Sequence, residues 1–475
     1  EVSAATPEGN GDAETTATAF PSPTPEPATP TPAAEAGATG IGDPDFPRVG
    51  NGGYDVQHYV IAMNVDVAGR QITGVTTVEA IATQPLLSFS FDFERFAIQE
   101  VRVDMQRVDH RYEGAKLFIT PAKPLAEGAE FIVEIAYRGQ PGISSTPPIP
   151  SGWYWGAGSG TVAAEPFGAK SWFPANDHPL DKATFHFGIT VPRPYVVAAN
   201  GLLRETIERD HQITYMWEAR DPMASYLATI SIDEYEVHTA HTADGLPLVS
   251  FFPPDRAKVL ARDFAPTAEM IPYFAELFGP YPFETYGVVV VGQSLPGFAA
   301  LETQTRSLFL GVPLSEDIQA HELAHQWFGN SVSLERWRDM WLKEGFATYA
   351  ELLWHERELG RAIVDERVAA RRSQMLRESQ SGFYAPPGMP PLEDLYNPNV
   401  YQGGAVVLHA LRLRVGDETF FEILRTYTDR YRYGNASTGD FIDVANEVSR
   451  QELGAFFDAW LYSGEVPELV AGPDE

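Results

Sequence analysis

The chain has no cysteine and no long apolar run, and each absence excludes a class of protein. Without cysteine, neither a disulfide nor a thiolate metal site can form, so any zinc ion must be bound by imidazole and carboxylate groups. A membrane-spanning helix needs about 18 or more consecutive apolar residues, and the sequence contains no such stretch. These absences direct attention to the histidines and the acidic residues.

Positive charge is also scarce. Lys and Arg number 34 against 65 Asp and Glu, which gives a formal net charge of -31 and a pI near 4.7. A nucleic-acid partner, which would need clustered basic residues, is therefore not expected. Surface acidity that keeps an exported protein soluble is favoured over an acidic site that attracts basic substrates.

The length of 475 residues, 44% of them hydrophobic, predicts two domains and a tail. Residues 1–43 are rich in Pro, Thr, Ala and Glu, as in "PSPTPEPATPTPAAEAGATG", and are expected to be disordered. Such a tail suits an extracellular or cell-surface enzyme held off a membrane or wall, with any anchor before residue 1. A featureless linker explains it equally well.

Two patterns follow the tail. Residues 44–239 contain alternating segments such as "HYVIAMNVDV" and "EFIVEIAYRG", which predict an antiparallel β domain. Residues 240–475 contain the strands "YGVVVVG" and "GFAALETQTRSLFL" and then mainly helical segments. We therefore predict an α+β multidomain fold, a β domain followed by a mainly helical one.

The stretch "IQAHELAHQWFG" contains the first candidate site. On a helix, His321 and His325 lie one turn apart on the same face, so both imidazoles can meet one metal ion. Glu322 lies about 100° round the helix, too far for a third ligand but well placed beside a metal-bound water. Two partly exposed helical histidines would give the same short motif, and on the motif alone the two interpretations are evenly matched.

Glu344 shifts this balance. Eighteen residues separate it from His325, and its neighbours Trp341, Leu342 and Phe346 are apolar. A carboxylate in such surroundings needs a partner, because an unpaired buried charge is costly. Two His and one Glu would leave a fourth zinc position open for water, as in a catalytic site.

Together these residues resemble a known family. "HELAH", eighteen residues and then "WLKEGFATY" is similar to the gluzincin zinc metallopeptidases of the aminopeptidase N family. "EPFGAKSWFPANDHPLDKATFHFGITVP", "GFAALETQTR" and "VYQGGAVVLHALR" resemble further family segments in the expected order. The resemblance implies a saddle-like N-terminal β domain, a thermolysin-like catalytic domain, and a short form without the helical C-terminal domain, whose active site is more open.

The resemblance also assigns catalytic roles. It implies one Zn²⁺ per chain, Glu322 as the general base for a zinc-activated water, and Tyr401 as the residue whose hydroxyl stabilises the oxyanion. Tyr396 is a weaker candidate for the tyrosine. The three zinc ligands are His321, His325 and Glu344.

Glu302 and Glu165 match the carboxylates that bind the substrate's free α-ammonium. Ala299 and Ala300 would lie in the same substrate-binding segment. Where the family has Gly-Ala-Met-Glu-Asn, this chain has Ala-Ala-Leu-Glu-Thr at residues 299–303. The missing glycine and asparagine leave room for cleavage of longer peptides or internal bonds.

The leading hypothesis is a zinc aminopeptidase acting on peptides. An endopeptidase or another hydrolase on the same scaffold is the alternative among enzymes. A binding protein that keeps the fold after losing catalysis is the alternative outside them. The oligomeric state and the side-chain preference are left open by the sequence.

Overall fold

The computed structural model describes residues 33–144, 146, 148–311 and 315–470. From Ala34 onward the chain forms one compact unit. None of the helices in these ranges is long and apolar enough to cross a membrane.

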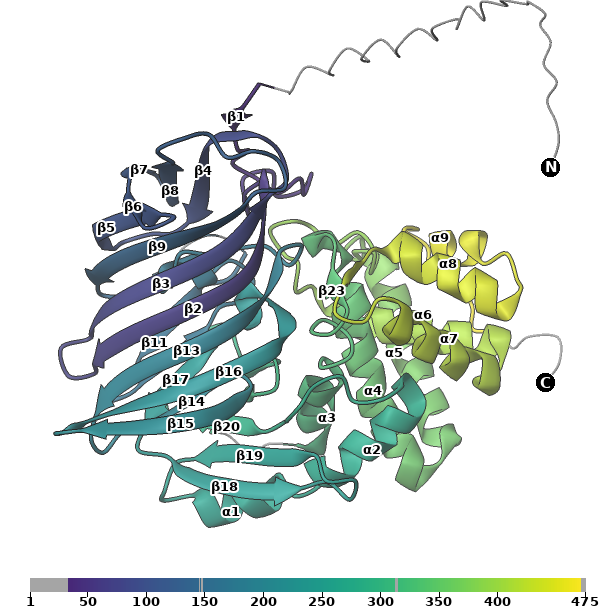
Figure 1. Cartoon of the computed structure of the whole chain (residues 1–475). Coiled ribbons are helices and arrows are strands. Elements are labelled where there is room, and N and C mark those ends of the chain that lie inside the picture. The colour runs from purple at the N-terminus through teal and green to yellow at the C-terminus, as the bar shows by residue number, and fades with distance from the viewer. Residues whose placement is uncertain (1–32, 145, 147, 312–314, 471–475) are drawn as a thin grey trace, which may run out of the picture. The chain divides into compact units, whose positions relative to one another are not determined.

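An eight-stranded sheet dominates the first part of this unit (Figure 1). Buried and exposed residues alternate along its strands, as the sequence predicts for a sheet with one face in the core. Neighbouring strands are antiparallel, except that β13 and β2 are parallel. In spatial order the strands are β15 (Leu202–Arg209), β16 (Gln212–Ala224), β13 (Lys182–Pro192), β2 (Tyr54–Asp66), β3 (Gln71–Ala82), β9 (Glu130–Gly139), β5 (Ala97–Val103) and β6 (Gln106–Arg107).

Two smaller sheets complete the β part. The five-stranded sheet contains β10 (Ile143–Ser144), β11 (Ser151–Trp155), β12 (Gly160–Ala163), β17 (Ile230–Asp233) and β14 (Val196–Ala199). The four-stranded sheet contains β1 (Glu35–Ala36), β4 (Leu86–Asp92), β8 (Lys116–Thr120) and β7 (Asp109–Glu113). Two single 3-10 turns, η1 (Ala169–Ser171) and η2 (Ser225–Leu227), interrupt the connections.

The second part combines a five-stranded sheet with helices. Its strands are β18 (Glu236–His241), β19 (Pro247–Phe252), β20 (Val288–Val291), β22 (Ser307–Leu310) and β21 (Ala300–Leu301), and a two-stranded ladder joins β23 (Ser333–Leu334) to β24 (Asn435–Ala436). The helices are α1 (Ala257–Asp263), α2 (Thr267–Phe278), α3 (Glu316–Ala324), α4 (Trp341–Leu359), α5 (Arg361–Ser381), α6 (Gly404–Val415), α7 (Asp417–Arg430), α8 (Thr438–Ser449) and α9 (Gly454–Leu461). Short turns η3 (Trp337–Asp339) and η4 (Asn399–Gly403) precede α4 and α6. The predicted α+β class, with a β part followed by a mainly helical part, is confirmed.

One predicted strand is wrong. "GFAALETQTRSLFL" is not one strand but two, β21 and β22, which pair antiparallel through Ala300↔Phe309 and Leu301↔Leu308. The chain reverses at Thr305, whose φ of 62° is a left-handed conformation. The turn is buried and polar, and it is held by hydrogen bonds to distant residues rather than by Gly or Pro, so the local sequence carries no turn signal.

The predicted tail of residues 1–43 also needs correction at its end. Residues 34–43 belong to the compact unit, where β1 pairs parallel with β4. Asp43 is buried and contacts Nε2 of His178 at 3.1 Å, which supplies an anchor that composition alone does not reveal. Residues 1–32 lie outside the described residues. The predicted division after residue 239 falls inside β18, so it cuts a strand of the second part.

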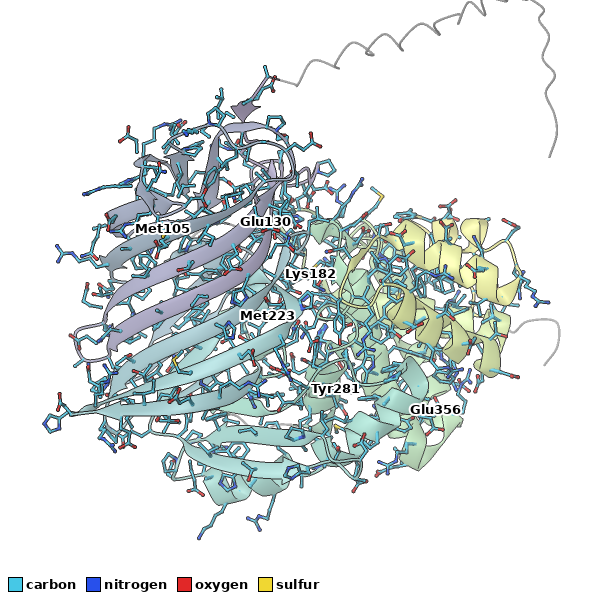
Figure 2. The ribbon with its side chains drawn as sticks, viewed as in Figure 1. Met105, Glu130, Lys182, Met223, Tyr281 and Glu356 are labelled. Atoms are coloured by element: carbon cyan, nitrogen blue, oxygen red, sulfur yellow. The ribbon has the colours of Figure 1, made fainter. Side chains whose placement is uncertain are left out.

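Buried polar contacts join the two parts. Figure 2 shows Lys182 on β13 where the large sheet meets the helical part. Its ammonium donates to the main-chain oxygens of Asn330 at 2.9 Å, Ser331 at 2.9 Å and Gly434 at 3.2 Å. Burial lowers the pKa of Lys182 to about 7, and the three main-chain oxygens accept from its charged form. The turn that follows α3 is thereby fixed against the β part.

Helices α4 and α6 approach so closely that only glycine fits at their crossing. A Cβ atom added to Gly345 would lie 2.8 Å from Cα of Gly404, and one added to Gly404 would lie 2.7 Å from Cα of Gly345. Both obstacles are backbone atoms, so a larger residue at either position would push the helices apart.

Gly345→Ala is expected to lower the free energy of unfolding by about 1–3 kcal/mol, because overpacking at the helix crossing outweighs the better helix propensity of alanine. Urea unfolding of the purified variant measures this loss. Gly454→Ala is the matched control, since nothing lies within 4 Å of a Cβ at that position. A Gly345→Ala protein as stable as the control would show that the crossing can relax.

Candidate active site

Helix α3 begins where the sequence predicts it. The hydroxyl of Ser315 accepts a hydrogen bond from the main-chain N–H of Ile318 at 3.4 Å. Glu316 and Asp317 occupy the first turn, where negative charge is stabilised by the helix dipole. This N-terminus fixes the rotation of α3 and hence the direction of the histidines one turn later.

The three predicted zinc ligands come together between α3 and α4. Oε2 of Glu344 lies 3.2 Å from Nε2 of His321 and 3.4 Å from Nε2 of His325. Atoms bound tetrahedrally to zinc at roughly 2.0–2.1 Å are about 3.3 Å from one another, so this spacing suits zinc. The donor set of two imidazoles and one carboxylate leaves a fourth position for water or substrate, as in catalytic sites.

Other groups hold the two histidines in the orientation that a metal requires. Nδ1 of His321 lies 2.7 Å from Oε1 of Glu351, and Nδ1 of His325 lies 3.0 Å from the main-chain oxygen of Phe328. Each contact uses Nδ1 as donor and leaves Nε2 free to bind the metal. The residues present therefore fit a zinc ion.

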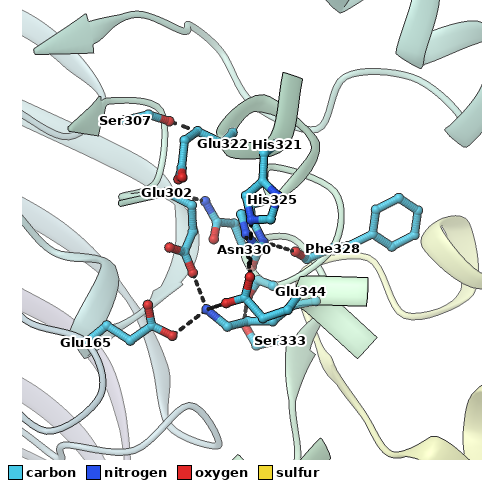
Figure 3. A network of polar contacts seen from close by, with 12 residues as sticks. Glu165, Glu302, Ser307, His321, Glu322, His325, Phe328, Asn330, Ser333 and Glu344 are labelled. Atoms are coloured by element: carbon cyan, nitrogen blue, oxygen red, sulfur yellow. Dashed lines mark hydrogen bonds and ion pairs between the residues drawn. The ribbon is translucent and has the colours of Figure 1, made fainter. Parts of the chain in front are cut away.

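A second cluster surrounds Lys343, which the sequence analysis does not identify. Its ammonium contacts three carboxylates, those of Glu165, Glu302 and Glu344. Figure 3 shows these three glutamates close together. Nζ of Lys343 lies 2.5 Å from Glu302 and 3.2 Å from Glu344 and also contacts Glu165 directly. The Lys343 side chain is 0% exposed. Glu165 comes from the β part and the other residues from the helical part, so this cluster joins the two.

The charges in this cluster depend on one another. Burial acts to lower the pKa of Lys343, but the three carboxylates outweigh it and hold that pKa well above its usual value. Burial likewise acts to raise the pKa of Glu302 and Glu344, but Lys343 overrides it and both remain ionised. Burial and then repulsion by Glu302 raise the pKa of Glu165 to about 8, so Glu165 is the carboxylate that binds its proton most readily.

The main chain at Glu302 is fixed to the end of α3. Its carbonyl oxygen accepts hydrogen bonds from Nδ2 of Asn330 at 2.7 Å and Nε2 of Gln326 at 3.2 Å. Gln326 also accepts from the N–H of Thr305 at 2.8 Å, so it ties the β21–β22 turn to the same place. The predicted amine-binding carboxylate is thus held in register with the predicted zinc ligands.

All nine predicted site residues line or reach one cavity of about 310 Å³. Its wall is formed by Ile149, Glu165, Gly297, Phe298, Ala299, Ala300, Leu301, Glu302, Ile318, His321, Glu322, His325, Glu344, Glu351, Tyr396 and Tyr401. Ala299 and Ala300, predicted from the family segment alone, lie on this wall beside Glu302.

Glu322 and the two tyrosines present polar groups to this cavity. Oε2 of Glu322 is buried without a hydrogen-bond partner among the described residues, and burial raises the pKa of that carboxyl well above its usual value. The ring of Tyr401 lies parallel to that of His321, with centroids 6.0 Å apart. Tyr401 is carried by the π-helical turn η4, an irregularity that is common at functional sites. The buried hydroxyl of Tyr396 also has no partner in the described structure.

The sequence contains signals for two further residues of the site, Lys343 and Glu351. Lys343 stands next to Glu344 in the same apolar stretch, so the argument that a buried charge needs a partner applies to it equally. Glu351 follows Glu344 by seven residues, two helical turns, which places both on one face of α4.

Comparison with known proteins identifies the same two parts. Residues 55–227 match the Peptidase M1 N-terminal domain, and residues 263–460 match the Peptidase family M1 domain. Similar proteins include Probable aminopeptidase 1 of Saccharolobus solfataricus, 26% identical over 441 residues, and Aminopeptidase M1 of Arabidopsis thaliana, 27% identical over 329 residues. The alignments cover 87% and 65% of this chain but only 54% and 37% of those relatives.

Solved structures show the similarity over a fuller length. The M1 zinc metallopeptidase from Deinococcus radiodurans is 30% identical, with a TM-score of 0.82 over 92% of this chain and 100% of that chain. A mutant of it bound to a Tyr-Ser-Ala substrate aligns with a TM-score of 0.81 over 90% of this chain and 99% of that chain. The predicted kinship, fold class and single catalytic Zn²⁺ are confirmed, and the chain belongs to peptidase family M1.

Proposed function

We propose that this protein is a zinc-dependent aminopeptidase that removes single residues from the N-termini of peptides. The observation that carries the proposal is the pair of carboxylates, Glu165 and Glu302, beside the metal ligands. Potential ligand atoms of Glu302, Glu322 and His325 all lie within 4.8 Å of one another, so little more than one residue fits between the carboxylates and the metal. The names of the similar proteins and the tripeptide bound in the Deinococcus structure support the same activity.

The charges at this end of the cavity suit one α-ammonium. The carboxylates of Glu165 and Glu302 each use Oε1 to contact Lys343. Among the residues described, no hydrogen bond engages the second oxygen of either. A substrate ammonium favours the ionised form of Glu165, and Glu165 and Glu302 together with Lys343 then leave one negative charge that the ammonium neutralises. A peptide that continued past this point would instead place neutral backbone against buried charge, which is unfavourable.

The other residues provide the chemistry. A zinc ion held by His321, His325 and Glu344 supplies a Lewis acid that polarises the scissile carbonyl and makes a water molecule more acidic. Glu322, whose Oε2 has no partner among the described residues, accepts a proton from the attacking water and passes it to the leaving amine. The hydroxyl of Tyr401 donates a hydrogen bond to the carbonyl oxygen as negative charge develops there.

The purified protein is expected to release leucine from Leu-Gln-Ala and to leave its N-acetylated form intact, because acetylation removes the positive charge that Glu165 and Glu302 bind. Mass spectrometry of the products measures both reactions. A strong chelator should abolish the release, and added zinc should restore it.

The same assay separates the alternatives. Cleavage of acetylated longer peptides at internal bonds would indicate an endopeptidase. A protein that binds zinc but cleaves none of these peptides would be a binding protein.

Tyr401→Phe is expected to lower kcat on the order of 10²–10³-fold and to leave the zinc content unchanged, because the phenol donates to the oxyanion and is not a ligand. Steady-state kinetics and metal analysis of the same preparation measure the two effects. Tyr396→Phe is the comparison within the same wall, and a larger loss there would transfer the role to Tyr396.

We further propose that the enzyme acts outside the cytoplasm, at the cell surface or free. The acidic composition and the Pro-rich N-terminal segment support this location. Protease treatment of intact cells tests it, because an enzyme exposed at the surface would be digested while a cytoplasmic marker survives. Protection equal to that of the marker would overturn the proposal.

A further inference from the structure

Five glutamates line the active-site cavity, and four of them have roles. The lining residues within the described ranges include no Lys or Arg, because Lys343 lies behind the carboxylates. The fifth glutamate, Glu351, contacts His321 and faces the cavity. We infer that Glu351 favours peptides whose second residue is cationic, an inference that rests on the proposed aminopeptidase function.

The direction of the bound peptide follows from the positions of the carboxylates. Glu302 lies near His325 and Glu322. Glu351 instead contacts the other histidine ligand, His321. An ammonium bound by Glu302 therefore places the first residue at the His325 end and the scissile carbonyl at the metal. The second residue then extends past His321 toward Glu351.

The contact between Glu351 and His321 does not require a charged group. His325 is oriented equally well by a neutral group, the main-chain oxygen of Phe328. The Glu351 contact uses only Oε1, and no hydrogen bond to the rest of the described chain engages Oε2. Its side chain is 24% exposed, compared with 3% for Glu302. The second oxygen is thus available to a group that enters from the cavity.

The surroundings of Glu351 suit a long basic side chain. Ile318, one turn before His321 on α3, also lines the cavity, so the methylene groups of Lys or Arg have an apolar surface to cover. Glu316 and Asp317 form the start of α3, just before Ile318. Asp317 contacts His355 of α4, and Glu316 contacts Trp354 of α4. A glutamate in the second position of the peptide would meet like charge here, while lysine would form an ion pair.

The test compares Leu-Lys-Ala, Leu-Gln-Ala and Leu-Glu-Ala, which differ only in the second residue. We expect kcat/KM to fall in this order, with a ratio between the lysine and glutamate peptides of roughly 5- to 20-fold, as a partly exposed attraction and a comparable repulsion together give. High salt should shrink this ratio because the pair is partly exposed. Leu-Ala-Lys and Leu-Ala-Glu should differ less, since their charge lies one residue farther on.

Glu351→Gln is the decisive variant, because glutamine keeps an oxygen that accepts from His321 and removes only the charge. Its kcat/KM ratio between Leu-Lys-Ala and Leu-Glu-Ala should fall to within about twofold of one. Glu358→Gln is the matched control, since it removes the same charge from an exposed position of the same helix, outside the cavity lining. The control should keep the full ratio.

The outcomes distinguish this inference from the function on which it rests. Release of leucine from Leu-Gln-Ala without any preference for lysine would overturn the role of Glu351 and leave the aminopeptidase intact. A preference that survives in Glu351→Gln, with zinc content unchanged, would overturn it as well. Failure to release the first residue from all five peptides and from their counterparts that begin with Tyr or Arg would overturn both.

Discussion

The ammonium of Lys343 is the interaction on which the rest of the active site depends. It contacts three carboxylates that burial alone would favour in their protonated form, one from the β part and two from the helical part. Removing one partner of a buried ion pair costs on the order of 3–5 kcal/mol, because the other charge remains without compensation. Lys343 therefore allows a zinc ligand and two substrate-binding carboxylates to lie within a few ångströms of each other. Without it, burial and mutual repulsion would favour the protonated form of both Glu165 and Glu302.

Because the site depends on contacts between Lys343 and distant carboxylates, many other contacts hold the segments that carry these residues at fixed distances from one another. Lys182 ties β13 to the turn after α3, and Gln326 and Asn330 tie the end of α3 to Glu302. The glycine contact between α4 and α6 brings the helix of Glu344 against the segment that carries Tyr401. Each of these contacts joins parts of the chain that are distant in sequence. A shift of either part would separate Lys343 from at least one of its carboxylates.

Two kinds of site residue can be predicted from the sequence. The position of the first kind follows from the periodicity of one helix, and the second kind lies in a family motif that the chain contains. His321 and His325 share a helix face, and Glu344 was found from its charge in an apolar stretch. Lys343 stands one residue earlier in the same apolar stretch, but two of its three carboxylate partners come from distant segments, so the sequence alone does not reveal the cluster. The β21–β22 turn was missed for a different reason. Its conformation at Thr305 is imposed by Gln326 and by the β part, so no local pattern contains it.

Part of the chain's acidic charge is concentrated in the active-site cavity. From sequence alone, solubility is the simpler explanation for a net charge of -31. The cavity wall, however, concentrates five glutamates, and a net field of one sign in a concave, poorly solvated site raises the local concentration of cations. The two ends of the site then divide this charge. At the His325 end the ammonium of Lys343 lies among the carboxylates, whereas at the His321 end the described wall contains no Lys or Arg beside Glu351. The enzyme would therefore bind two positive charges of a peptide, the α-ammonium at the terminus and the side chain of the second residue.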